Sequence, residues 1–219
     1  MVEYKRVSPG QADAVLPFRT VAAFVEATRP VATAFSCLAT VPRFGGSPGD
    51  VAEMARLVER PVLFKDIVVD RRQLEVAART GAGAVLLIAR LADLGVPVVA
   101  LESLADEAHR LGLEVVLEFH HRAELSRMAH VAADVYGVNM RDLGTLAIDR
   151  ATAEATLEAA AAEGRHPLLG LSGVERAADA RRLWNRGADA LLVGTAVARS
   201  PDPAAFLSTL VRTASPGSA

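Results

Sequence analysis

The feature that most constrains the fold is a regular alternation of short apolar runs with longer amphipathic stretches. The apolar runs are rich in Val, Leu and Ile, and several are continuous, which is typical of parallel strands buried on both faces. We expect strands over Val2–Arg6, Val31–Leu38, Pro61–Lys65, Gly83–Ile88, Glu114–Phe119, Val135–Asn139, Pro167–Leu171 and Ala188–Gly194. We expect helices over Val51–Arg60, Arg71–Thr80, Leu101–Leu111, Ala123–Ala132, Ala151–Glu163, Arg176–Arg186 and Pro203–Arg212.

This order predicts an α/β protein. Eight strands that alternate with helices within 219 residues favour a closed (β/α)8 barrel, the TIM barrel, over an open sheet. No Gly-x-Gly-x-x-Gly turn follows the first strand, which argues against a dinucleotide-binding fold. Because no Pro/Gly/Ser-rich linker divides the chain, we expect one catalytic barrel domain over residues 1–213 and a disordered tail over 214–219.

Composition and charge narrow the possible partners and compartment. A net charge of −2 points to neither nucleic acid nor an anionic membrane surface. Cys37 is the single cysteine, so no intrachain disulfide is possible. The chain starts without an apolar signal segment, and no apolar run reaches the roughly 18–20 residues that span a bilayer. We expect a cytoplasmic protein, a monomer or weak homodimer, whose partner is a small molecule.

Polar residues interrupt the expected strands near their carboxyl ends, where barrel enzymes carry their active sites. Glu3 and Lys5 lie two apart, so their side chains share one face of the first strand. Lys65 and Asn139 close two strands, and Glu118 follows the apolar run of another. Each residue alone is a solvated rim residue as readily as a catalytic one. Five of them at one end of the barrel favour an acid–base site.

Two small-residue sites follow the last two strands, Ser172-Gly173 and Gly194-Thr195. Loops at these positions commonly bind phosphate in barrels, because glycine lets backbone N–H groups approach the anion closely. We therefore expect a phosphorylated substrate. No His/Cys/Asp group has metal-ligand spacing, and His120-His121 is interpreted as a loop pair, so we predict no metal site.

Several motifs, in order along nearly the whole chain, resemble those of the indole-3-glycerol phosphate synthase family. The first-strand segment Val2–Pro9 resembles Glu-x-Lys-x-x-Ser-Pro, and Gly137–Leu143 resembles Gly-Ile-Asn-x-Arg-Asp-Leu. Further similar segments are Ser36–Ser47, Val62–Asp66, Leu117-Glu118, Ser172–Val174 and Leu192–Thr195.

The resemblance implies a carboxy-lyase of tryptophan biosynthesis, an amino-acid biosynthetic enzyme that closes an indole ring. The family's substrate is 1-(2-carboxyphenylamino)-1-deoxyribulose 5-phosphate, which loses CO2 and water. The resemblance implies that this chemistry needs no metal and no organic cofactor. The implied catalytic residues are Lys65 as general acid, Glu118 as general base, and Glu3 and Asn139 around the substrate hydroxyls. The implied substrate-binding residues are Lys5, Ser8, Phe44, Arg141 and Leu171, and the implied phosphate-binding residues are Ser172, Gly173, Gly194 and Thr195.

The chain departs from the family pattern around the expected pocket. Leu171 stands where the family usually has Glu, and Ile67 where it has Phe. The loop residues 39–43 read Ala-Thr-Val-Pro-Arg where the family usually has acidic and basic residues. The family's helical N-terminal extension is absent, which predicts a more open site. These departures suggest a variant of the reaction on a related amino-sugar phosphate adduct in specialised metabolism.

Two alternatives stay open. A sugar-phosphate isomerase of a related barrel family is the first, and the Lys and Glu residues of the first and third strands argue against it. A non-catalytic barrel that binds a phosphorylated ligand is the second, and the presence of Lys65, Glu118 and Asn139 argues against it.

Overall fold

The computed structural model describes residues 1–8, 14–40, 44–91, 93–96 and 99–213. The expected tail over 214–219 and part of the second-strand loop therefore lie outside the described residues, as does the side chain of Ser8. Within the described part of the chain, no helix is long and apolar enough to cross a membrane.

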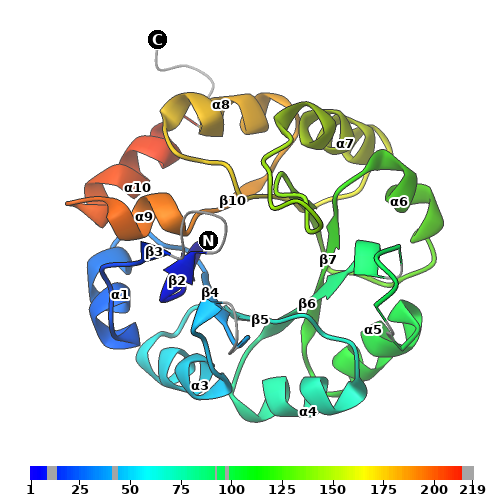
Figure 1. The fold of residues 1–219 in the computed structure, drawn as a ribbon, viewed down its shortest axis with the longest axis horizontal. Coiled ribbons are helices and arrows are strands. Elements are labelled where there is room, and N and C mark those ends of the chain that lie inside the picture. The colour runs from blue at the N-terminus through cyan, green and yellow to red at the C-terminus, as the bar shows by residue number, and fades with distance from the viewer. Residues whose placement is uncertain (9–13, 41–43, 92, 97–98, 214–219) are drawn as a thin grey trace.

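Eight parallel strands of the described chain form one sheet that closes into a barrel, as predicted (Figure 1). In spatial order they are β1 (Val2–Tyr4), β4 (Phe35–Leu38), β5 (Val62–Lys65), β6 (Ala84–Ile88), β7 (Glu114–Phe119), β8 (Val135–Asn139), β9 (Leu168–Leu171) and β10 (Ala190–Leu192). The barrel closes where Val2 bridges Val193, and the Glu3 N–H donates to the Val193 carbonyl at 3.0 Å.

Helices surround the strands as an outer ring (Figure 1). They are α1 (Val21–Thr28), α3 (Pro48–Leu57), α4 (Arg71–Arg79), α5 (Leu101–Arg110), α6 (Arg122–Arg127), α7 (Arg150–Ala162), α8 (Ala177–Asn185), α9 (Thr195–Arg199) and α10 (Pro203–Arg212), with a 3-10 turn η1 (Ala89–Leu91). Side-chain hydrogen bonds cap the N-termini of several of these helices. The Ser47 hydroxyl accepts from the Asp50 N–H at 3.1 Å, and Asp70 and Gln73 form a capping box.

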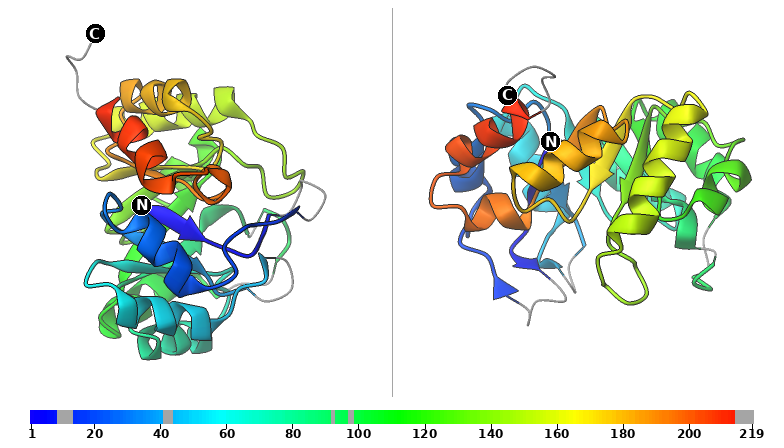
Figure 2. Two further views of the ribbon diagram at one scale, coloured as in Figure 1. Left: turned by 90° about the vertical axis from the view of Figure 1, so that its left-hand side faces the viewer. Right: turned by 90° about the horizontal axis from the view of Figure 1, so that it is seen from above.

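The structure corrects several predicted boundaries. The second barrel strand begins at Phe35 rather than Val31, and α6 ends at Arg127 rather than Ala132. Helix α1 and the short α9 were not expected. After β1, β2 (Val7–Ser8) and β3 (Ala14–Val15) form a small antiparallel pair. In Figure 2 (right), this pair and the loop between β8 and α7 project from one side of the barrel.

Buried apolar side chains form two clusters, one between the strands and the helices and one inside the barrel. The inner cluster fills the barrel with Leu63, Ala84, Leu86, Ile88, Leu91, Val116, Leu169, Leu171 and Leu192. A filled interior is a packed core rather than a pore, so ligands meet the barrel only at its ends. The polar residues at the carboxyl ends of the strands therefore lie against an apolar floor.

Candidate active site

Three charged side chains from the start of the chain and from β5 meet at the barrel mouth. The Glu3 carboxylate lies 3.1 Å from Lys5 Nζ through Oε1 and 2.9 Å from Lys65 Nζ through Oε2. Glu3 is only 4% exposed, and the side chain of Lys65 is 16% exposed. Lys5 lies one residue beyond the end of β1, yet its side chain reaches the same carboxylate. The two lysines therefore share one buried counter-ion.

The pKa values of this group follow from competition between burial and pairing. Burial raises the pKa of Glu3, but Lys65 and Lys5 outweigh it and lower that pKa from 4.5 to about 2. Burial lowers the pKa of Lys65, but the charges of Glu3 and Glu118 outweigh it, and the net pKa is raised. At neutral pH, Glu3 is a carboxylate and Lys65 keeps its proton. A buried ammonium of this kind can deliver a proton where negative charge develops.

Glu118 and Asn139 come from the neighbouring strands β7 and β8. Glu118 is 1% exposed, and its Oε2 has no hydrogen-bond partner among the described residues. The Asn139 Oδ1 accepts from the Arg141 N–H at 2.9 Å, while the Arg141 guanidinium donates to the Leu146 carbonyl at 2.8 Å. These bonds tie the loop that follows β8 to the end of its strand. The free carboxylate oxygen of Glu118 is a ready proton acceptor.

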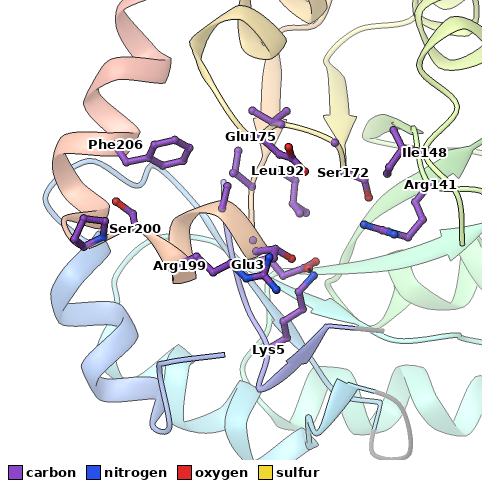
Figure 3. A pocket seen from close by; sticks show the side chains of 17 residues that line it. Glu3, Lys5, Arg141, Ile148, Ser172, Glu175, Leu192, Arg199, Ser200 and Phe206 are labelled. Atoms are coloured by element: carbon purple, nitrogen blue, oxygen red, sulfur yellow. Dashed lines mark hydrogen bonds and ion pairs between the residues drawn. The ribbon is translucent and has the colours of Figure 1, made fainter. Parts of the chain in front are cut away.

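A cavity of about 580 Å³ opens beside this charged group (Figure 3). Its wall combines the charged start of the chain with the segments after β8, β9 and β10. The lining residues are Glu3, Lys5, Arg141, Ile148, Ser172, Gly173, Val174, Glu175, Leu192, Val193, Gly194, Thr195, Ala196, Arg199, Ser200, Pro201 and Phe206. In Figure 3, Arg141 and Arg199 approach from opposite sides, with Lys5 and Glu3 between them. Three cationic side chains thus surround a volume suited to an anionic ligand.

The expected phosphate-binding residues are all in this wall, and their backbone explains why they are small. Ser172 and Gly173 follow each other with φ values of 67° and 66°, the left-handed region. A Cβ at Gly173 would lie 3.0 Å from Met140 Cε. At Gly194, a Cβ would lie 3.1 Å from Glu3 Oε1, so the absence of a side chain there makes room for the buried carboxylate.

Other expected site residues do not line the cavity. Lys65, Glu118 and Asn139 are not among the residues of its wall. Lys65 is joined to the wall by its ion pair with Glu3, and Asn139 by its hydrogen bond with Arg141. Phe44 is half-buried, and its carbonyl accepts from the Arg6 N–H at 3.2 Å.

Leu171, predicted as a substrate-binding residue, is fully buried in the inner cluster, and its side chain lies over Gly137. This burial places Leu171 in the barrel interior rather than in the wall of the cavity. A Cβ at Gly137 would come within 2.8 Å of Leu171 Cδ1. The two residues therefore fit as a pair, since the side chain of one occupies the space that the other leaves empty.

Sequence reasoning missed part of the cavity wall, including Ile148, Glu175, Arg199 and Phe206. Arg199 ends α9, a short helix whose five residues carry too little periodicity to be recognised. Ile148 lies in the loop after β8, where its backbone bridges Arg141. Among the described residues, no three His, Cys, Asp or Glu side chains are grouped to hold a metal ion.

The fold and site define a class, the (β/α)8-barrel enzymes that act on small phosphorylated molecules. The family model described as "Indole-3-glycerol phosphate synthase" matches residues 1–210, and the chain belongs to that family. Among its relatives, an indole-3-glycerol phosphate synthase of Exiguobacterium sibiricum is 33% identical over 94% of this chain and 78% of its own length. Indole-3-glycerol phosphate synthase 2 of Streptomyces coelicolor is 41% identical over 82% of this chain and 67% of its own length.

Solved structures agree on the fold. The 3-hexulose-6-phosphate synthase from Salmonella typhimurium matches with a TM-score of 0.72 and 13% identity, over 97% of this chain and 96% of its own. The thiamine phosphate pyrophosphorylase from Pyrococcus furiosus matches with a TM-score of 0.68 and 16% identity, over 97% of this chain and 93% of its own. At these identities the likeness concerns the barrel alone.

Proposed function

We propose that this chain catalyses the indole-ring closure of 1-(2-carboxyphenylamino)-1-deoxyribulose 5-phosphate, with loss of CO2 and water. The observation that carries the proposal is the family match over residues 1–210. The isomerase and the non-catalytic alternatives are not favoured by the comparisons, because the named relatives are indole-3-glycerol phosphate synthases.

In the first step, Lys65 acts as the general acid. The ring carbon that bears the carboxylate attacks the sugar carbonyl carbon, and the carbonyl oxygen takes a proton from Lys65 Nζ as the new C–C bond forms. The carboxylate then leaves as CO2, and its bonding electrons restore the aromatic ring. The raised pKa of Lys65 supports this role, because the residue stays protonated until a basic oxygen develops beside it.

In the second step, the hydroxyl formed in the first step takes up a proton from the solvent and leaves as water. The substrate loses a further proton as the new ring double bond forms, and Glu118 is the residue that accepts it. The unpartnered Oε2 supports this role, since that oxygen has its full capacity to accept a proton. Asn139 positions the sugar hydroxyls, and Glu3 holds Lys65 in place through the 2.9 Å ion pair.

Binding of the substrate is assigned to the cavity. The loop residues Ser172, Gly173, Gly194 and Thr195 surround the phosphate, and Lys5 and Arg141 supply positive charge for the phosphate and the carboxylate. The buried Leu171 and the exposed Ile67 leave the neighbourhood of the charged group less polar and less aromatic than the family pattern. These two positions are the basis for the narrower alternative of a related substrate.

The test is to mix the purified protein with the carboxyphenylamino deoxyribulose phosphate and to follow indole fluorescence together with CO2 release. We expect both signals in equal amounts, and a fall of both rates by about 10²–10⁴-fold, to a measurable residual rate, in the isosteric Glu118→Gln variant. Rates near those of ordinary family members would eliminate the related-substrate alternative. An Amadori-type rearrangement without CO2 would establish the isomerase, and calorimetric binding without turnover of this or any related adduct would establish the non-catalytic barrel.

A further inference from the structure

His120 is buried beside Glu118 without an ordinary hydrogen-bond partner. It follows the end of β7 two residues after Glu118, so the two side chains lie on the same side of the chain. His120 is 3% exposed, and its Nε2 lies 3.4 Å from Glu118 Oε1. Neither ring nitrogen makes a hydrogen bond within the described residues. The next residue, His121, differs, because its ring contacts the Arg90 guanidinium.

A buried imidazole with two unpaired nitrogens is costly, and such groups are rare in folded proteins. The carboxylate of Glu118 is an acceptor close to the ring, 3.4 Å from Nε2. The neutral tautomer that carries its proton on Nε2 donates to Oε1 after a small rotation of either side chain. Oε2 then stays free of partners, and the carboxylate interacts with the charge of Lys65. Oε1 of Glu118 is then held by a hydrogen bond, and Oε2 is left for the substrate.

The backbone of His120 is fixed independently. Its N–H donates to Glu124 Oε2 at 2.7 Å, and Glu124 is itself buried in the first turn of α6. This bond ties the segment after β7 to the helix that follows it. The ring of His120 therefore approaches Glu118 from a constrained position.

We propose that His120 is a positioning residue for Glu118, which it orients by donating Nε2–H to Oε1. The proposal rests on the proposed function, in which Glu118 is the general base. His120 has its ring nitrogens shielded from solvent and is not in the cavity wall, so it acts through Glu118 rather than on the substrate.

The test compares His120→Gln with His120→Asn in the ring-closing assay. Both are neutral amides, but the glutamine amide reaches the place of Nε2, whereas the shorter asparagine amide reaches only that of Nδ1. We expect His120→Asn to lower kcat by about 10–100-fold, with KM and the thermal midpoint little changed. We expect His120→Gln to recover most of the rate. Equal rates for the two variants would overturn the proposal.

A second comparison places the effect on Glu118. In a Glu118→Gln background, His120→Asn should cause no further loss, because residues that act as a unit are not additive. A further loss of the same size as in the wild-type background would overturn the proposal while leaving the proposed function intact. Absence of turnover in the wild-type chain would instead overturn the proposed function, and this inference with it.

Discussion

The two halves of the barrel mouth differ in the types of residue that form them. The half formed by β1, β5 and β7 consists of charged side chains, Glu3, Lys65 and Glu118. Against the effect of burial, Lys65 lowers the pKa of Glu3, and the two carboxylates raise the pKa of Lys65. The half that follows β9 and β10 consists of small residues and turned backbone. The first half suits proton transfer and the second suits anion binding. We therefore expect substitutions in the first half to change mainly kcat, and substitutions in the second half to change mainly KM.

The largest effect is expected from Lys65→Met in the charged half. Removing the general acid should lower kcat by about 10²–10⁴-fold, the usual contribution of such a group. Binding of a phosphorylated substrate analogue should be nearly unchanged, because the phosphate half is intact. Stopped-flow fluorescence gives the rate, and calorimetry gives the affinity. A parallel loss of affinity would break the separation of the two halves.

A double-mutant cycle at Leu171 and Gly137 tests the packing of the inner cluster beneath both halves. Leu171→Ala should lower the free energy of unfolding by about 2–5 kcal/mol, because it opens a cavity in the inner cluster. Gly137→Ala alone should cost about 1–3 kcal/mol through overpacking against Leu171 Cδ1. In the double variant the new methyl group occupies part of the vacated space, so the combined cost should be smaller than the sum. Additive costs from urea denaturation would contradict this fit.

The charged half should also make the free energy of unfolding depend on pH. The pKa of Glu3 is depressed from 4.5 to about 2, so its stabilising contribution is full above pH 4.5 and is lost as the pH falls toward 2. Glu3→Gln removes this contribution, which is worth a few kcal/mol at about 1.4 kcal/mol per pKa unit. Urea denaturation of both proteins from pH 7 to acid should show the two free energies converging. If the difference between the two free energies of unfolding stays constant with pH, it does not come from the ionised carboxylate of Glu3.

Gly194→Ala tests the contact between the two halves, where Gly194 lies against the carboxylate of Glu3. The added methyl group would lie 3.1 Å from Glu3 Oε1, so either the carboxylate or the loop must shift. We expect kcat to fall and KM to rise together, each by about tenfold, which corresponds to roughly 1.4 kcal/mol. Gly83→Ala is the matched control, because a Cβ there meets no atom within 4 Å. If only KM rises, the methyl group disturbs the phosphate loop and not Glu3.

The smallest effect is expected from Ile67→Phe. Ile67 is 41% exposed, so the change should alter the free energy of unfolding by no more than about 0.5 kcal/mol. An aromatic ring at this position, as in the family pattern, should lower KM for the carboxyphenylamino substrate a few-fold at unchanged kcat. A higher KM would favour a substrate with a different ring.

Much of this fold follows from the sequence, because continuous apolar runs separated by helical stretches are a strong signal of a parallel barrel. The contact between Glu3, Lys5 and Lys65 also follows, since strand ends of a barrel converge. Helix α1 was missed although Val21, Phe24, Val25 and Thr28 recur at helical spacing. The β2–β3 pair was missed because two-residue strands carry no periodicity.

The side-chain directions at strand ends were harder to predict. A shift of one residue exchanges the inside and the outside of a strand, and sequence alone does not fix where a strand stops. For β9 the predicted end at Leu171 is also the observed one, and Leu171 was expected in the pocket because the family usually has Glu there; its apolar side chain is buried in the inner cluster instead. His120 lies after the end of β7, as interpreted, but its burial beside Glu118 was not predicted, because sequence alone does not show how the chain turns after a strand.

The closure of the barrel joins residues that are almost a whole chain apart. Met1 and Glu3 pair with Leu191 and Val193, and the carboxylate of Glu3 lies against Gly194. A contact of such long sequence separation forms only after a large loss of chain entropy, so it is slow to form compared with local structure. During synthesis, Glu3 has no site to occupy until β10 has been made. Recovery of activity on refolding should therefore report the completion of the whole barrel and not the appearance of its helices.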